Sequence, residues 1–228
     1  MKGNFSTGAK AICFFLILVS LSGGYIFYEF IHASATINKK PLSVCGCKLA
    51  KNSIPVMLIA GILAQEDDLF LHHRGVNWRQ AWYSLKENIS SRRVVTGAST
   101  IDMQVAALCY LNHRNSSRWI RKFRQVIYAL LMNRYYRKED ILKAYIAAAP
   151  LIEGSNTLGF QSAAEYYYRK PLKKLDLDEQ WGLILALRNR DKLNPDAIKR
   201  GVKIPEKIRG QTMRAKLRQQ HLLKMISD

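Results

Sequence analysis

An uncharged and mostly apolar run near the N-terminus, from Ala11 to Tyr28, constrains the fold of this chain more than any other feature. Inside a bilayer the backbone has no water to hydrogen-bond, so a run of this length can cross it only as a helix. We therefore predict a transmembrane anchor over residues 11–31. The sequence Ala33-Ser34-Ala35 is an acceptable cleavage site, which leaves a processed secretory signal as an open alternative.

The rest of the sequence reads as one helical domain behind a linker. The linker is polar and contains Pro41 and Gly46. From Ile54 onward, apolar residues recur three and four positions apart, and no stretch alternates as a strand would. The predicted fold is therefore mainly α. Its predicted segments are a tail at 1–10, the anchor at 11–31, the linker at 32–51 and the domain at 52–228.

The charge of the chain narrows the class of partner. Lysine and arginine number 36 against 17 acids, which gives a formal net charge of +19. This balance favours a polyanionic partner, namely nucleic acid, an anionic membrane or a phosphorylated substrate. A nucleic-acid binder would explain the charge but not the anchor, so we do not predict one.

Three acids, two histidines and a glycine lie in the stretch from Ala64 to Gly75. Glu66 falls near the end of a predicted helix, where the helix dipole, Asp67 and apolar neighbours all disfavour a carboxylate. We expect these influences to raise the pKa of Glu66, which suits a general base. An exposed acidic helix end with a packed His73 is the alternative explanation of the same pattern.

The next predicted helix carries Trp78, Trp82, Leu85 and Ile89 on one face, with basic residues nearby. Tryptophan beside basic side chains is typical of a helix that lies in a membrane interface. A stripe that faces the protein core would give the same spacing.

Four cysteines do not form an obvious disulfide framework. Cys13 lies in the predicted anchor, Cys109 lies in a helical pattern, and only Cys45 and Cys47 are neighbours. A small Cys45–Cys47 bridge is one interpretation. Two unpaired thiols on the linker are the other, and we prefer it.

A further helix is predicted to begin after Gly97, with Ser99 as its N-cap and Asp102 completing a capping pair. Free N–H groups at such a helix start can also bind an anion. Later in the chain, Arg121 and Lys122 are adjacent on a long predicted helix. They are either solvated or clamp a diphosphate.

Four ordered motifs make the chain resemble the peptidoglycan glycosyltransferases of glycosyltransferase family 51, above all the monofunctional membrane-anchored members. The resemblance covers Ile54 to Pro195. The positions that match, motif by motif, are Glu66, Asp67, Phe70, His73 and Gly75; Gly97, Ser99, Thr100, Ile101 and Gln104; Arg121, Lys122, Ile141, Leu142 and Tyr145; and Gly159, Ala163, Ala164 and Tyr167. No Ser-x-x-Lys or Lys-Thr-Gly sequence occurs, so transpeptidase activity and penicillin binding are not expected.

The resemblance implies a lysozyme-like fold with a membrane-facing lobe, which favours the interfacial interpretation of the tryptophan-bearing helix. It also implies that a glycan on undecaprenyl diphosphate is the donor and lipid II the acceptor. Glu66 would deprotonate the acceptor 4-hydroxyl, while Arg121 and Lys122 would stabilise the departing diphosphate. The implied substrate-binding residues also include Asp67, Phe70, His73, Gly75, Ser99, Thr100 and Gln104.

The implied location is the bacterial cytoplasmic membrane, which the chain would cross once, with its domain on the periplasmic or extracytoplasmic side. The implied partners are lipid II, the growing glycan, the membrane and other cell-wall synthesis proteins. We predict no metal-ligating residues and no certain cofactor, but a divalent ion (Mg²⁺ or Mn²⁺) at the diphosphate stays open.

Several positions depart from the family pattern. Gln125 stands where the family has its second catalytic glutamate, and Ala107 replaces a lysine. Met103, Asn133 and Ala147 stand where glutamine, glutamate and asparagine are usual. An amide cannot hold a metal or a proton as a carboxylate does, so a second hypothesis is a non-catalytic member that binds lipid II or glycan. A third, a lytic muramidase that uses the acid of the first motif alone, lacks support from the second motif.

Overall fold

The computed structural model describes residues 7–46, 54–91, 97–111, 117–152, 158–188, 193–201, 203–218 and 220, with the side chains of the first helix described from Ser22 onward. All regular structure in these ranges is helical, as predicted. The elements are α1 (Thr7–Lys39), η1 (Leu42–Val44), α2 (Val56–Glu66), η2 (Phe70–His72), α3 (Trp78–Ser90), α4 (Ile101–Cys109), α5 (Arg118–Tyr135), α6 (Lys138–Ala148), α7 (Phe160–Tyr168), η3 (Leu172–Lys174), α8 (Leu177–Arg188), α9 (Pro195–Lys199) and α10 (Glu206–Arg218).

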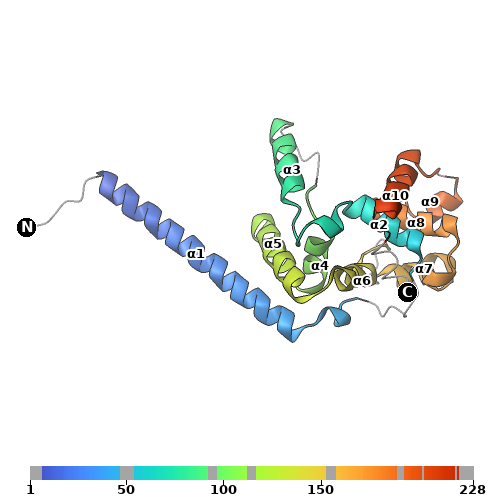
Figure 1. Cartoon of the computed structure of the whole chain (residues 1–228), viewed down its shortest axis with the longest axis horizontal. Helices are drawn as coiled ribbons and strands as arrows, with labels where there is room; N and C mark the ends of the chain where they lie inside the picture. Colours follow the sequence, from blue (N-terminus) through green and yellow to red (C-terminus); the bar gives the residue numbers. More distant parts are fainter. Residues whose placement is uncertain are drawn as a thin grey trace, which may run out of the picture.

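Helix α2 runs through the main core of the domain. Residues 58–63 are all buried, as expected for a helix stretch that is apolar on every side. Helices α8 and α10 pack against it, and Figure 1 shows α10 beside it. Gly61 permits the approach of α8, because a Cβ there would lie 2.3 Å from Cδ1 of Ile184. This packing fixes the end of α2, where Glu66 is the last helical residue.

Helices α4, α5 and α6 form the second part of the core, with α4 in contact with both of the others. The chain that leaves α2 returns past α5 at Gly75, which has a φ of +92°. A Cβ at this position would lie 2.4 Å from the carbonyl oxygen of Ala129, so only glycine fits. The close approach brings the end of α2, the start of α4 and the middle of α5 together.

Helix α1 continues beyond the predicted anchor and includes the first part of the predicted linker. Figure 1 shows it projecting from the domain, with its C-terminal end against α5. Ala33 and Ile37 are buried in the main core. One turn earlier, the carboxylate of Glu29 is 2% exposed and accepts hydrogen bonds from the guanidinium of Arg124 at 2.6 and 2.9 Å. The C-terminal part of α1 is therefore packed as a part of the domain.

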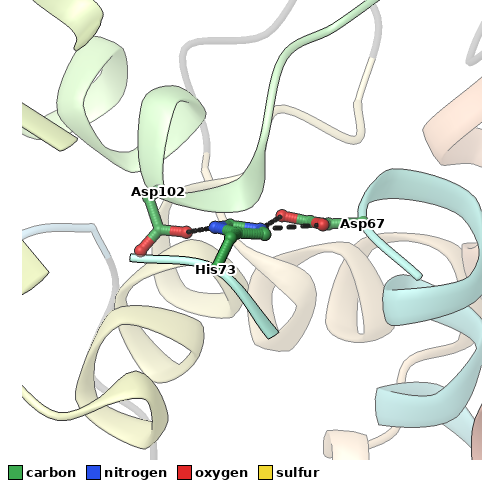
Figure 2. Close-up of side chains that lie close together, drawn as sticks. All are labelled: Asp67, His73 and Asp102. Atoms are coloured by element: carbon green, nitrogen blue, oxygen red, sulfur yellow. Dashed lines mark hydrogen bonds and ion pairs between the residues drawn. The ribbon is translucent and has the colours of Figure 1, made fainter. Parts of the chain in front are cut away.

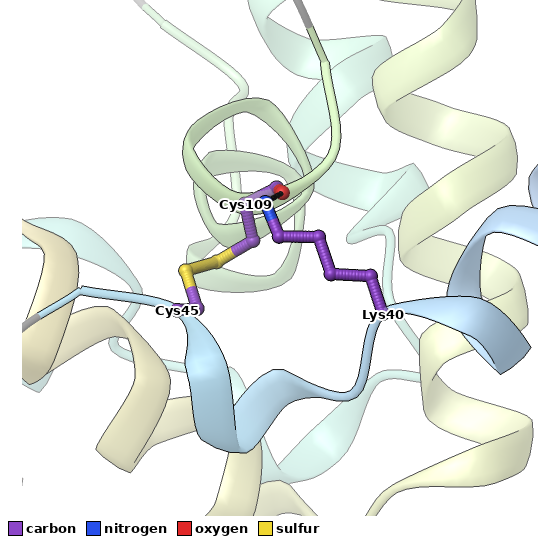
Figure 3. Close-up of a disulfide and its surroundings, with 3 residues drawn as sticks. All are labelled: Lys40, Cys45 and Cys109. Atoms are coloured by element: carbon purple, nitrogen blue, oxygen red, sulfur yellow. Dashed lines mark hydrogen bonds between the residues drawn. A yellow bond between two sulfur atoms is a disulfide. The ribbon is translucent and has the colours of Figure 1, made fainter.

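Cys45 and Cys109 form a disulfide, with their Cα atoms 5.4 Å apart (Figure 3). The preference for unpaired thiols was therefore wrong for Cys45, and its partner is not Cys47, which lies outside the described residues. Figure 3 also shows the side chain of Lys40 extending to Cys109 beside the disulfide, where its ammonium donates to the carbonyl oxygen of Cys109 at 2.7 Å. The pairing joins residues 64 positions apart, a distance over which local sequence patterns carry no information.

Within the part of the chain that the structure describes, no helix combines the length and the apolar character needed to cross a membrane. The side chains from Ala11 to Leu21, which make up much of the predicted anchor, lie outside the described residues. The anchor over residues 11–31 therefore stays a prediction.

Candidate active site

Glu66 lies at the C-terminal end of α2, where its carboxylate is largely buried. The side-chain amide of Gln104, from α4, donates to Oε2 of Glu66 at 2.5 Å. Burial is the main cause that raises the pKa of Glu66, and the charge of Asp67 raises it further, while the Gln104 hydrogen bond opposes both. The predicted direction of the pKa shift is confirmed. A carboxylate that is easier to protonate than usual, yet held by one donor, is suited to general base catalysis.

Asp67, the residue after Glu66, forms a buried pair with His73. The ring Nε2 of His73 lies 3.1 and 2.9 Å from the two carboxylate oxygens of Asp67 (Figure 2). The Oδ2 atom of Asp67 also accepts the backbone N–H of Ile101, the first residue of α4, at 3.1 Å. An exposed acidic helix end therefore does not describe this stretch, because Asp67 is 8% exposed and joins α2 to α4.

The start of α4 differs from the predicted capping pair. Thr100 is the N-cap, and its hydroxyl accepts from the N–H of Met103 at 3.2 Å and donates to the carbonyl oxygen of Gly75 at 2.6 Å. Ser99 lies one residue too early to cap, and its hydroxyl accepts from the ammonium of Lys122 at 2.7 Å. Asp102 is fully buried and contributes to the core instead of the cap. Hydroxyl residues at consecutive positions made the N-cap ambiguous from sequence.

A pocket of about 560 Å³ opens beside Glu66. Its lining combines the carboxylate with three side-chain amides and several small or apolar groups. The lining residues are Gln65, Glu66, Gly97, Ser99, Gln104, Ala107, Leu108, Gln125 and Pro150. Gln125 and Ala107, two of the departures from the family pattern, therefore both face the space next to Glu66.

A second, cationic pocket of about 320 Å³ adjoins the first, and the two share Ser99 and Gln125. Its other lining residues are Arg118, Trp119, Arg121 and Lys122. Partial burial lowers the pKa of the Lys122 ammonium, which its hydrogen bond to Ser99 orients at the junction of the pockets. The two pockets place a carboxylate with a raised pKa near a set of cations suited to a phosphate group.

The structure divides the predicted substrate-binding residues into two groups. Ser99, Gln104, Arg121 and Lys122 line the pockets. Asp67, Phe70, His73, Gly75 and Thr100 do not line them and instead hold α2, α4 and α5 in place. Sequence reasoning missed Gln65 and Trp119 as lining residues. Trp119 is 84% exposed, and a search of the sequence for aromatic residues beside the basic residues of α5 could have found it.

Helix α3 presents its large apolar side chains to solvent. Trp78, Trp82, Leu85 and Ile89 are 62, 59, 50 and 68% exposed. The core-facing alternative for this stripe is therefore wrong. A contiguous set of exposed apolar residues on one helix is typical of an interaction surface.

Asp67, His73 and Asp102 offer ligand atoms within 4.8 Å of one another, which raises the question of a metal site. Figure 2 shows the imidazole between the two carboxylates, so its nitrogens face different partners instead of a common point. The ammonium of Lys138 already lies 2.9 and 3.0 Å from the oxygens of Asp102 and compensates its charge. These three residues fit a hydrogen-bond network better than a cation site.

Comparison with known proteins places these pockets in a family context. A model of the transglycosylase family matches residues 46–224. The biosynthetic peptidoglycan transglycosylase of Acinetobacter baumannii is 36% identical over 126 residues, which is 55% of this chain and 54% of that protein. Penicillin-binding protein 1A of Pseudomonas aeruginosa is also 36% identical over 126 residues, but these are 15% of its length. Penicillin-binding protein 1F of Bacillus subtilis is 31% identical over 151 residues, 66% of this chain and 19% of that protein.

The chain spans about half the length of the peptidoglycan transglycosylase that it matches, and a smaller share of the two penicillin-binding proteins. The family match, in contrast, covers most of this chain, including both pockets and the helices that shape them. By this match, the chain belongs to the transglycosylase family.

Proposed function

We propose that this chain is a peptidoglycan glycosyltransferase that polymerises lipid II. The observation that carries the proposal is the pair of adjoining pockets, one with the largely buried Glu66 and the other with Arg121 and Lys122. Transfer of a sugar from a diphosphate needs a base for the acceptor hydroxyl and cations for the leaving diphosphate, and the two pockets offer these groups side by side. Family membership and the names of the relatives point to the same reaction.

The proposed reaction forms one bond and breaks one bond at the anomeric carbon of the donor. The 4-hydroxyl oxygen of the acceptor attacks that carbon, and the ionised Glu66 takes the hydroxyl proton. The bond from the anomeric carbon to the diphosphate breaks, and its electron pair leaves with the diphosphate. Arg121 and Lys122 stabilise the negative charge that builds up there. The amide of Gln104 keeps Glu66 oriented and favours its ionised form before the transfer.

A divalent cation at the diphosphate has a poor set of protein ligands in these pockets. Among the described lining residues Glu66 is the only carboxylate, and the proposed reaction uses it as the base. Mg²⁺ sites in proteins normally use carboxylates together with substrate phosphates. The proposed mechanism therefore contains no step through a metal ion.

We further propose that the chain is anchored by residues 11–31 and works at the extracytoplasmic face of a bacterial cytoplasmic membrane, next to other cell-wall synthesis proteins. The uncharged run in this segment supports the anchor. The Cys45–Cys109 disulfide supports an oxidising compartment. The exposed apolar face of α3 supports a lobe, in a lysozyme-like fold, that rests on the membrane surface.

The test of the function is polymerisation of labelled lipid II by the purified full chain in detergent, read as glycan ladders on a gel. The Glu66→Gln variant should lose about 10²- to 10⁴-fold in rate, the usual contribution of a positioned base, and should still bind lipid II. Asp68→Asn is the matched control, because it neutralises the exposed acid two positions later. Full turnover by Glu66→Gln would remove Glu66 from the mechanism.

One observation favours a second candidate function, a non-catalytic protein that binds lipid II or glycan. Gln125 faces both pockets with an amide where the resemblance calls for a carboxylate, and Ala107 brings no cation. The variant Gln125→Glu with Ala107→Lys separates the candidates. A decayed enzyme should gain activity in this variant, whereas an enzyme adapted to the amide should lose it. If the wild type and the variant both bind lipid II without forming glycan, the binder replaces the enzyme.

A further inference from the structure

A buried charge network joins helices α4, α5 and α6 to the segment that carries His73. Its centre is Asp102 on α4, which has no solvent exposure. The amide of Asn133, from α5, donates to Oδ1 of Asp102 at 2.5 Å. The ammonium of Lys138, at the start of α6, donates to Oδ1 and Oδ2 at 3.0 and 2.9 Å. On the other side, Nδ1 of His73 lies 3.9 Å from Oδ2 (Figure 2).

A fully buried carboxylate is costly unless it is paired and hydrogen-bonded, so this arrangement constrains the helices around it. Burial raises the pKa of Asp102 and lowers that of Lys138, and their mutual attraction opposes both shifts. Lys138 also lies over the ring of Phe70, 4.3 Å from its centroid, which leaves it little freedom to move. Neither charged group has another partner of opposite sign within hydrogen-bond distance among the described residues.

Helix α4 connects this network to the candidate base. The same short helix carries Asp102 at its second position and Gln104 at its fourth, and Gln104 donates to Glu66. The first N–H of the helix, that of Ile101, donates to Asp67. A shift of the N-terminal turn of α4 would therefore alter the contacts of both neighbouring carboxylates. The ion pair between Asp102 and Lys138 opposes such a shift.

We propose that Asp102 is a positioning residue, which ties α4 to Lys138 and so sets the hydrogen bond that Gln104 makes to Glu66. This inference rests on the proposed function of Glu66 as the base. It also gives the departure at position 133 a physical explanation. The carboxylate that the family resemblance leads one to expect on α5 is supplied at the same junction by α4, and Asn133 donates to it.

The decisive variant is Asp102→Asn, which keeps the shape of the side chain and removes its charge. With α4 loosened, kcat for lipid II polymerisation should fall roughly 10- to 100-fold, because small displacements near a reacting group have effects of this size. KM should change little, since Arg121 and Lys122 are untouched. Asp140, a partly exposed acid on α6, supplies the matched control Asp140→Asn, which should leave kcat unchanged.

A second measurement separates a positioning role from a merely structural one. The free energy of unfolding is measured against pH for the wild type and for Glu66→Gln. The difference between the two curves reports the titration of Glu66 and requires no catalysis. The titratable groups recorded around Glu66 are Asp67 and Tyr145, and burial holds the pKa of Tyr145 well above its ordinary value. Asp102→Asn should move this titration to higher pH, because a weakened Gln104 hydrogen bond favours the ionised form less.

The sign of that shift discriminates between mechanisms. Asp102→Asn removes a negative charge and leaves the ammonium of Lys138 unpaired, and any electrostatic effect of these two changes on Glu66 would move its titration to lower pH. An upward shift therefore requires a change of position. Asp102→Asn with Asn133→Asp exchanges carboxylate and amide between two touching side chains, and it should restore most of kcat and the wild-type titration.

Three results would overturn the inference: an Asp102→Asn variant with unchanged kcat and titration, a downward shift of the titration, or a swap variant no better than the single one. If the wild type makes no glycan while Asp102→Asn still shifts the titration upward, the proposed function fails and the positioning role survives. If the wild type polymerises lipid II and Asp102→Asn matches it in both measurements, the function stands and the positioning role fails.

Discussion

Removal of the Cys45–Cys109 disulfide offers a quantitative test of the structure. The bridge closes a loop between residues 64 positions apart, and the chain-entropy model assigns a loop of that length about 4 kcal/mol of stability at 25 °C. In this model the folded protein gains stability because the bridge lowers the conformational entropy of the unfolded chain. The hydrogen bond from Lys40 to Cys109 and the burial of Leu42 can persist in the reduced protein, so they do not change the expected loss.

The assay is guanidinium or thermal unfolding of the full chain in detergent, oxidised and reduced, with alanine variants of each cysteine. Cys45→Ala, Cys109→Ala and the double variant should lose similar amounts, because each breaks the same bond and the effects of coupled groups do not add. A loss of about 4 kcal/mol corresponds to a fall in Tm of about 8 to 16 °C for a domain of this size.

Cys47→Ala is the internal control, since it changes a neighbouring cysteine that the bridge does not use. Equal destabilisation by Cys47→Ala and Cys45→Ala, with Cys109→Ala neutral, would show that the neighbouring cysteines pair instead. A loss below about 1 kcal/mol in all variants would refute the argument that the bridge restrains this loop. Activity should also fall on reduction, because Cys109 directly follows Leu108, which lines the pocket beside Glu66.

Three further predictions follow from the buried and exposed groups. Because the folded protein holds a proton on Glu66 to higher pH than the unfolded chain does, stability should fall as pH rises above the ordinary range of a glutamate, and Glu66→Gln should remove that slope in urea unfolding. Trp82→Ser should weaken binding to anionic vesicles in a co-sedimentation assay without lowering Tm, whereas the equally exposed Tyr166→Ser on α7 should not weaken it. Glu29→Gln should destabilise the domain by about 1 to 3 kcal/mol in thermal unfolding, because it leaves the guanidinium of Arg124 without its charged partner.

The helices themselves were predictable from the sequence. Apolar spacing alone predicted that Glu66 lies near the end of a helix, and α2 does end there, because periodicity is a local property that the backbone converts directly into a buried face. Longer stripes were less reliable. Ile120 and Leu130 fit the apolar spacing of α5 but are 38 and 40% exposed, because α4 and α1 cover only part of that helix.

The composition of the candidate site was also accessible from sequence order, since the motif residues Glu66, Gln104, Arg121 and Lys122 do line two adjoining pockets. The sequence did not show which motif residues line the pockets and which hold the helices in place. Asp67 and Thr100 look equally polar in the sequence, and only the packing of the start of α4 against Asp67 and Gly75 shows that their polar atoms bind backbone groups.

The tertiary structure alone decided the long-range pairings. Cys45 and Cys109, Glu29 and Arg124, and Asp102 and Lys138 are separated by many residues, and each pair forms because helix packing brings the two side chains within bonding distance. A single sequence records the type and the local spacing of its residues, and from these it determined the helices and the chemistry. Distances between segments depend on how the helices pack, so the disulfide, the docking of α1 and the buried network around Asp102 became visible only in the folded chain.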